Sequence, residues 1–244
     1  MNKFLKKRSP LSTYKLKSIN LEDEVAETEE QVTEEFHEDE FNPFNNNISF
    51  PDPQLLKYYR DVDQRIIWLL QDVDQSSYSI VEQIIQYNEE DKDLPIEERM
   101  PIRIIIDSAG GLVQMTFVIA DIIKMSKTPV YGYAFGACCS GASIIYLSCH
   151  RRFALPNANF LFHKGSCGGI TGTYDQVQAF MSHYKIQVDR IVEFYEKHTK
   201  YPKELIQEKL TGSSDWYILA DEAIEYNVVD EIVTDIEQIL LPKI

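Results

Sequence analysis

Three widely spaced residues in this 244-residue chain have the side chains that acyl transfer by serine requires. Ser140 offers a hydroxyl nucleophile, His163 an imidazole that can act as a general base, and Asp215 a carboxylate that can orient the imidazole. The reaction also needs N–H donors for the oxyanion, and the backbone of Gly111 and of Gly141, both in glycine-rich turns, can supply them. Together these five residues form one coherent candidate catalytic site.

Ser140 lies in a stretch of very small residues, YGYAFGACCSGA at 131–142, that is followed by an apolar run at 142–147. Small neighbours allow a sharp backbone turn, and the apolar run is typical of a buried helix. The stretch therefore predicts a strand-to-helix junction with Ser140 beside helix N–H groups, which favour negative charge. A serine at such a junction also suits a simple helix cap, and this stretch alone leaves both interpretations open.

His163 is the one histidine that follows a predicted buried strand, residues 160–162, and precedes a glycine-rich segment, residues 165–172. A lone histidine in this place can be a base or a packed core residue. Asp215 lies between a Gly/Ser turn and two aromatic residues, where a carboxylate can orient an imidazole or cap the turn. The other histidines are expected in the acidic N-terminal part or in exposed helices and their ends: His37, His150, His183 and His198.

The elements that must position these residues are predicted to form an α/β domain with a mainly parallel sheet. A β-branched run at 102–106 predicts a central strand, residues 112–127 have helical periodicity, and a strand resumes at 130–135. Strand, glycine turn, helix and strand make a βαβ unit, so the two strands run parallel. Their carboxyl ends meet at one sheet edge, and the glycine turn before the helix is therefore expected beside the Ser140 turn.

The remaining elements are predicted from shorter apolar patterns. Residues 88–101 are acidic, contain two prolines and indicate a surface loop. The predicted strands are 65–70, 152–155, 160–162 and 228–233, and the predicted helices are 55–61, 78–87, 174–197, 202–210 and 220–226.

Residues 1–50 differ in composition from the rest of the chain. Six basic residues and no acid in the first twenty are followed by eleven acidic residues and no Lys or Arg between Glu22 and Glu40. Such charge blocks are typical of disordered segments, so we predict a disordered charged extension over 1–50 and a globular domain over 53–244. A regulatory tail and a solubilising extension both fit this composition.

Composition also narrows the class of protein. The formal net charge of −15 argues against nucleic acid as the main partner. No apolar run is long enough for a membrane span, and no secretory signal precedes the acidic block. The four cysteines make neither a disulfide framework nor a zinc-binding pair, which favours a reducing compartment such as the cytoplasm. The basic residues at 1–20 also fit an organellar targeting segment.

Across 58–233 the chain resembles the proteolytic subunit of Clp protease, the ClpP family. The matching blocks are RIIW at 65–68, IIIDSAGG at 104–111, GACCSGA at 136–142, RFALPNANFLFH at 152–163 and DWYILADEAIEYNVVDEIV at 215–233. The family pattern reads I-N-S-P-G-G, then G-Q-A-A-S-M-G-A, with similar blocks after it. The resemblance implies that Ser140 is the nucleophile, His163 the base and Asp215 the acid, with Gly111 and Gly141 as oxyanion donors.

The chain departs from the family pattern around the site. Asp107 and Ala109 replace Asn and Pro, Gly141 replaces Met, and the adjacent cysteines 138 and 139 replace two alanines. A thiol nucleophile is one rival mechanism, although buried cysteines are usually inert. A serine–lysine dyad with Lys164 is another, although strand alternation directs that side chain away from the His163 side. Residues 1–50 do not resemble the family's axial gate segment.

The resemblance implies a ClpP/crotonase-type fold of stacked ββα units, with a protruding handle at about 164–197. It also implies homo-heptameric rings stacked as a tetradecamer, which cleave unfolded polypeptides delivered by an AAA+ unfoldase. The chain lacks a phosphate-binding GxxxxGK[ST] motif, so ATP is expected to be used only by that separate chain, with no cofactor or metal here. The alternatives are a non-catalytic or weakly active ring subunit and a crotonase-type acyl-CoA enzyme.

Overall fold

The computed structural model describes residues 52–212 and 215–240. The predicted disordered extension over 1–50 lies outside the described residues. The chain divides into two compact units, Met1–Asp63 and Gln64–Ile244. The described part of the first unit is the helix α1 (Pro53–Asp63), which has no buried residue.

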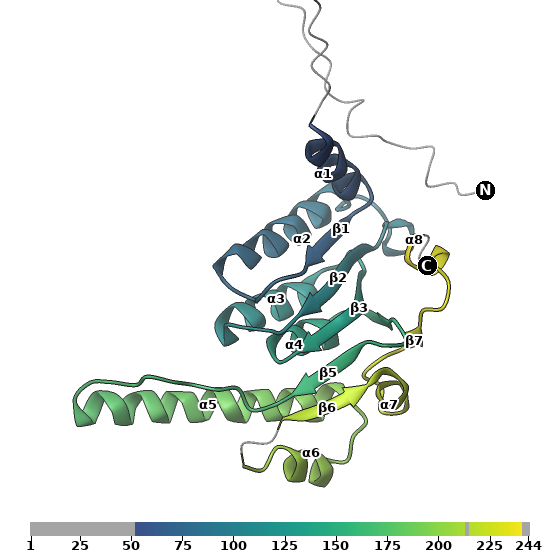
Figure 1. Cartoon of the computed structure of the whole chain (residues 1–244). Helices are drawn as coiled ribbons and strands as arrows, with labels where there is room; N and C mark the ends of the chain where they lie inside the picture. Colours follow the sequence, from purple (N-terminus) through teal and green to yellow (C-terminus); the bar gives the residue numbers. More distant parts are fainter. Residues whose placement is uncertain (1–51, 213–214, 241–244) are drawn as a thin grey trace, which may run out of the picture. The chain divides into compact units, whose positions relative to one another are not determined.

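The second unit is built on a seven-stranded sheet that is parallel except at one edge (Figure 1). Five strands run in the order β1-β2-β3-β4-β7, all parallel to their neighbours, while β5 pairs with β3 and β6 pairs antiparallel with β5. The mainly parallel sheet predicted from the βαβ pattern is therefore confirmed. The strands are β1 (Ile66–Leu69), β2 (Ile102–Ser108), β3 (Val130–Cys139), β4 (Arg151–Ala154), β5 (Asn159–Phe162), β6 (Trp216–Leu219) and β7 (Glu231–Ile232).

The strand β3 has two different neighbours along its length. Its first half pairs with β4 from Tyr131 to Ala134, and its second half pairs with β5 from Ala137 to Cys139. The second half extends four residues beyond the predicted strand 130–135, because its small residues are held between β2 and β5. This extension carries β3 directly up to Ser140.

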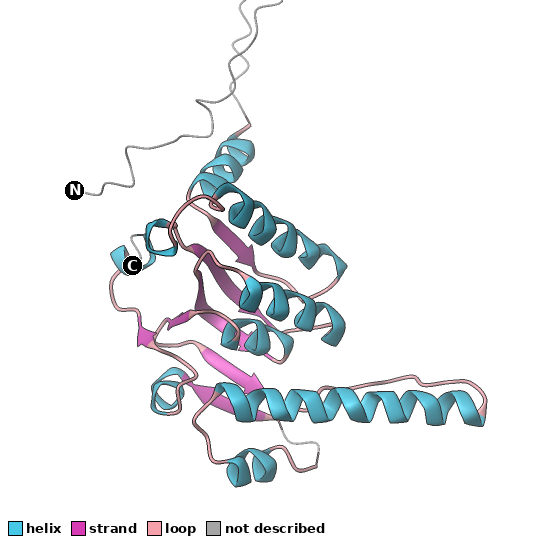
Figure 2. Ribbon diagram, turned by 180° about the vertical axis from the view of Figure 1, so that it is seen from behind, coloured by secondary structure: helices cyan, strands magenta, loops and turns pink. Residues whose placement is uncertain are grey.

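Three helices cover one face of the sheet, as Figure 1 and Figure 2 show from opposite sides. They are α2 (Tyr78–Glu90), α3 (Val113–Met125) and α4 (Gly141–Leu147), and their apolar sides form the main core with the strands. A smaller cluster around Tyr133 and Phe153, whose rings stack 4.7 Å apart, forms a second core that excludes these helices. The other helices are α5 (Tyr174–His198), α6 (Lys203–Lys209), α7 (Ala220–Glu225) and α8 (Glu237–Leu240), with short 3₁₀ turns at Gln75–Ser77 and Ile96–Glu98.

The 25-residue helix α5 projects beyond the sheet in both views, where the handle was predicted (Figures 1 and 2). It begins at a capping box in which Thr173 and Gln176 satisfy each other's backbone N–H groups. Near its carboxyl end Ile191 and Tyr195 are buried, whereas Phe180 and Ile186 are 42% and 55% exposed. No helix within the described ranges is long and apolar enough to cross a membrane.

The prediction of a surface loop over 88–101 is wrong in part. The helix α2 continues to Glu90, and the side chains of Asp91 and Arg99 are buried. Burial is possible because Asp91 forms a bidentate ion pair with Arg65, at 2.5 and 2.8 Å, and accepts a hydrogen bond from Thr128 Oγ1 at 3.0 Å. The predicted strand 228–233 is shorter than expected, and β6 and α8 were not predicted.

Candidate active site

Ser140 occupies a strained turn between β3 and α4. Its φ of +52° and ψ of −122° are rare for a residue with a side chain. Two hydrogen bonds hold the turn, from Ser140 N–H to the Leu161 carbonyl at 2.8 Å and from Ser143 Oγ to the Ser140 carbonyl at 2.6 Å. The Ser140 side chain makes no capping hydrogen bond to α4, so the helix-cap interpretation is not supported.

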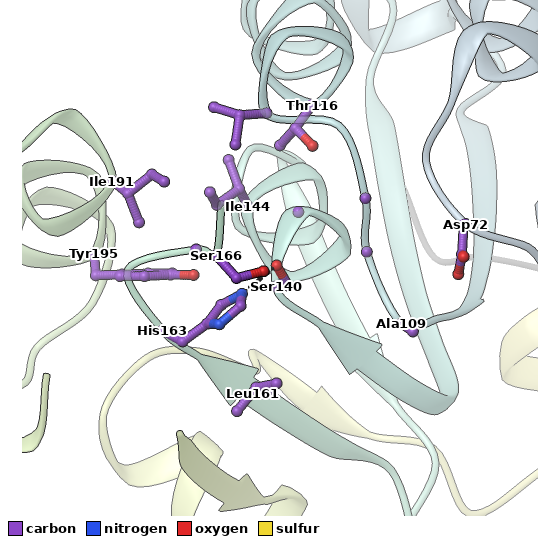
Figure 3. A pocket seen from close by; sticks show the side chains of 15 residues that line it. Asp72, Ala109, Thr116, Ser140, Ile144, Leu161, His163, Ser166, Ile191 and Tyr195 are labelled. Carbon is purple, nitrogen blue, oxygen red and sulfur yellow. Dashed lines mark hydrogen bonds between the residues drawn. The ribbon is translucent and has the colours of Figure 1, made fainter. Parts of the chain in front are cut away.

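His163 follows directly after β5, the strand that pairs with the end of β3. That pairing brings the imidazole to Ser140, with 2.5 Å between Ser140 Oγ and His163 Nε2 (Figure 3). A hydroxyl and an imidazole within hydrogen-bond reach are the arrangement that an activated serine needs. The structure thus brings together the hydroxyl and the imidazole that the serine-triad chemistry and the family resemblance had paired.

Asp215 lies immediately before β6, the antiparallel partner of β5. Asp215 Oδ1 is 3.6 Å from His163 Nδ1, and the side chains are 50% and 21% exposed respectively. This distance exceeds that of a hydrogen bond, and catalytic hydrogen bonds are often long before substrate is bound. The carboxylate is thus on the correct side of the imidazole, but it is further away and more solvated than the Ser140 hydroxyl.

The turn after β2 approaches the Ser140 turn closely at Gly110, which has no side chain. Gly110 has a φ of +97°, and a Cβ on it would lie 2.6 Å from the Cys139 carbonyl oxygen and 2.7 Å from Gly141 N. Val73 fixes this turn by donating its N–H to the Gly110 carbonyl at 2.7 Å. Within the described residues, the N–H groups of Gly111 and Gly141 donate to no acceptor, so both are free to bind a substrate oxygen.

A cavity of about 270 Å³ opens onto these groups. Ser140 and His163 reach it from one side, and Thr116 and Ile191 from α3 and α5 (Figure 3). Four glycines and four aliphatic side chains make up most of the remaining wall, whereas Asp72 adds a carboxylate at the far end. Its lining residues also include Ala109, Gly110, Gly111, Val113, Gly141, Ile144, Leu161, Gly165, Ser166 and Tyr195.

Tyr195, on α5, supports the site although the helical pattern at 174–197 did not single it out. Its ring is fully buried and stacks on Phe162 at 4.2 Å. Its hydroxyl is 3.3 Å from Ser143 Oγ and also hydrogen-bonds the main chain of His163. Burial raises the pKa of this phenol, so it stays neutral. Tyr195 therefore links the backbone of His163 to Ser143, which holds the Ser140 turn.

The rival nucleophile and base are poorly placed. Cys138 is fully buried, and burial raises the pKa of its thiol well above the ordinary value, which disfavours a reactive thiolate. Burial also raises the pKa of Cys139, whose sulfur contacts Asn159. Lys164 lines a different cavity with Asp189, as strand alternation predicted. Over the described ranges, no cluster of three or more His, Cys, Asp or Glu side chains could hold a metal ion.

Comparison with known proteins finds relatives that are proteolytic subunits of Clp protease. The chain is 31% identical over 180 residues to the ATP-dependent Clp protease proteolytic subunit of Deinococcus radiodurans, an alignment that covers 72% of this chain and 83% of the relative. It is 33% identical over 136 residues to proteolytic subunit 1 of Chlamydia caviae, covering 54% of this chain and 70% of the relative.

The fold is similar to that of a mutant ClpP1 from Listeria monocytogenes, with a TM-score of 0.62 and 23% identity over 73% of this chain and 96% of the other. This likeness confirms the predicted ClpP/crotonase-type fold. The family model for Clp protease matches residues 54–236, which is three quarters of the sequence. By these matches, the chain belongs to the Clp protease family.

Proposed function

We propose that this chain is a proteolytic subunit of a self-compartmentalised, ATP-dependent serine protease, and that it cleaves peptide bonds of unfolded proteins. Its catalytic residues are Ser140, His163 and Asp215, and the backbone of Gly111 and Gly141 binds the oxyanion. The observation that carries the proposal is the 2.5 Å contact between Ser140 Oγ and His163 Nε2 at a strained turn. Strain of this kind persists where the surrounding structure holds it, and it gathers at active sites.

The first half of the reaction forms an acyl-enzyme. Ser140 Oγ attacks the scissile carbonyl carbon as His163 Nε2 takes the hydroxyl proton. The tetrahedral intermediate places its oxyanion in front of the N–H groups of Gly111 and Gly141. His163 then gives the proton to the amide nitrogen, the C–N bond breaks, and the amine product leaves an ester on Ser140. Asp215 stabilises the imidazolium while the proton is on His163.

The second half regenerates the enzyme. A water molecule gives a proton to His163 and attacks the ester carbonyl, again with the oxyanion at the two glycine N–H groups. The ester C–O bond breaks, Ser140 recovers its proton from His163, and the new carboxylic acid leaves. Every proton is carried by this chain's own side chains, so we propose that the step needs no cofactor.

The assembled form is part of the proposal. Homo-heptameric rings stacked as a tetradecamer would enclose the site in a chamber, and an AAA+ unfoldase would deliver unfolded chains in the cytoplasm. The exposed apolar residues on the outer half of α5, which include Phe180 and Ile186, support burial of the handle against a second copy. Native mass spectrometry of the full chain measures this, and a monomer at micromolar concentration would refute the assembly.

The chemistry is tested by intact-protein mass after treatment with a fluorophosphonate probe. We expect one adduct on the wild type and none on Ser140→Ala or His163→Ala, because the probe reacts only with an activated serine. No adduct on the assembled wild type would refute the proposal and favour a non-catalytic ring subunit. If the unreactive protein also bound coenzyme A, the result would instead favour a crotonase-type acyl-CoA enzyme. Intact mass also shows whether residues 1–50 are removed on assembly.

A further inference from the structure

Thr116 on α3 carries a buried hydroxyl that nothing in the described part of the chain binds. The residue is 1% exposed, it lines the cavity, and its Oγ1 has no hydrogen-bond partner within the described ranges. A buried hydroxyl without a partner costs stability. Such a group in a candidate active site therefore calls for a ligand atom that satisfies it.

The position of the hydroxyl indicates which ligand atom that is. A Cβ built on Gly141 would stand in hard contact with Thr116 Oγ1 and 3.3 Å from Gly111 N. Gly141 is the first residue of α4, and in a helix the Cβ direction tilts toward the amino terminus, the same side as the free N–H groups. Thr116 Oγ1 and Gly111 N therefore border the same position, which lies on the N–H side of Gly141.

We propose that the Thr116 hydroxyl is a third donor of the oxyanion site, beside the N–H groups of Gly111 and Gly141. This inference rests on the proposed serine peptidase function and adds a residue to it. We place the oxyanion about 2.9 Å from both N–H groups, with Thr116 Oγ1 on the same side of Gly141 as Gly111 N. Three donors then share the charge that develops as Ser140 attacks.

The same contact explains why position 141 holds glycine where the family pattern has methionine. A side chain at 141 would begin in the space that the Thr116 hydroxyl fills. Thr116 and Gly141 are therefore a matched pair, in which a side-chain donor from α3 takes the place of side-chain bulk from α4. This pairing leaves the Gly141 N–H in place.

The test compares Thr116→Val, which has the same shape without the hydroxyl, with Thr116→Ser, which keeps it. Hydrolysis of a short fluorogenic peptide amide by the full-length assembled protein gives kcat and KM, and a peptide boronate reports on the tetrahedral state. We expect Thr116→Val to lower kcat about 10²-fold, with KM changed less than about twofold and boronate binding weakened in parallel. Thr116→Ser should retain kcat within about threefold.

Thermal unfolding separates this role from a structural one. Because the valine removes a buried hydroxyl without a partner, the Tm of Thr116→Val should equal or exceed that of the wild type. A packing role predicts the reverse, a lower Tm with both substitutions. A Thr116→Val variant with wild-type kcat, or a Thr116→Ser variant as impaired as the valine one, would overturn the inference.

A second measurement uses Gly141→Ala alone and combined with Thr116→Ala. Gly141→Ala alone should abolish fluorophosphonate labelling of Ser140, because the new methyl group collides with the Thr116 hydroxyl. The double variant should regain part of this labelling. Equal loss in both would overturn the pairing. The two proposals fail differently: a wild type without a fluorophosphonate adduct refutes both, whereas a labelled wild type with an unaffected Thr116→Val variant refutes only the third donor.

Discussion

Replacing Gly110 with alanine tests whether the glycine turn after β2 and the nucleophile turn must be in direct contact. A Cβ at this position would lie 2.6 Å from the Cys139 carbonyl oxygen, 2.7 Å from Gly141 N and 2.7 Å from Ser140 Cβ. All three atoms belong to the Ser140 turn, and none is the end of a flexible side chain. The turn must therefore move if the methyl group is to fit.

The size of the effect follows from these distances. Ordinary contacts of a Cβ begin at 3.4 Å, so the Ser140 turn would shift by roughly 0.8 Å. A misplacement of about 1 Å at a catalytic group costs about 10²-fold in rate. Alanine at a φ of +97° adds strain of about 1–3 kcal/mol to the folded state. This is less than the usual stability of a domain, so Gly110→Ala should stay folded but react slowly.

The assay is the rate of fluorophosphonate labelling at Ser140, measured beside urea unfolding. Gly168→Ala is the matched control, because this glycine lies in the loop before α5, has no positive φ and has no heavy atom within 4 Å of a new Cβ. We expect a loss of about 10²-fold for Gly110→Ala and wild-type labelling for Gly168→Ala. Wild-type labelling of Gly110→Ala would refute the argument that contact between the turns sets the position of the nucleophile.

Three further predictions concern the triad acid, the core and the response to pH. Asp215→Asn should lower the labelling rate about 10²-fold, less than loss of a fully buried triad acid, since the carboxylate is half exposed; an unchanged rate would remove Asp215 from the site. Asp91→Asn should lower the free energy of unfolding, measured in urea, by about 3 kcal/mol, because Arg65 would remain as a buried charge with a weaker partner. Asp189→Asn is the control: it removes the exposed pair of Lys185 and Asp189, and the free energy of unfolding should hardly change. Burial lowers the pKa of His198, so the folded protein binds fewer protons than the unfolded chain. The contribution of neutral His198 to folding stability is therefore fully present above a pH of about 6.5 and is lost as the pH falls. Between pH 7.5 and 5.5 the Tm of His198→Gln should thus fall less than that of the wild type. An equal fall would contradict this reasoning.

The parallel sheet and its helices were predictable because their patterns are local. The β-branched run that became β2 and the helical spacing that became α3 each carry their own signal in a few consecutive residues. The strand β6 carries less signal, since its four residues alternate buried and exposed positions and depend on pairing with β5. The buried charge of Asp91 gave none, because its partner Arg65 is 26 residues away.

The sequence identified the site residues that directly follow strands. Ser140 and His163 follow two strands that pair in parallel, and parallel strands end at one sheet edge. The sequence paired their hydroxyl and imidazole through the chemistry of a serine triad and the family resemblance, whereas the pairing of β5 with β3 came from the structure. Thr116 and Tyr195 escaped notice because each lies within a helix whose apolar spacing already accounts for burial, and periodicity does not tell which buried polar atom faces a cavity.

The departures from the family pattern lie where the proposed mechanism uses the backbone alone. Residues 109 and 141 are Ala and Gly where the pattern has Pro and Met, yet the mechanism asks only for an N–H at Gly141 and for the turn that Val73 fixes at Gly110. Ser140 and His163, whose side chains would form and break bonds in that mechanism, keep the family's residue types. Position 110 is equally restricted in residue type, because no side chain fits there. Substitution at 141 therefore needs only a neighbour that matches it in volume, and Thr116 fills that space with a hydroxyl.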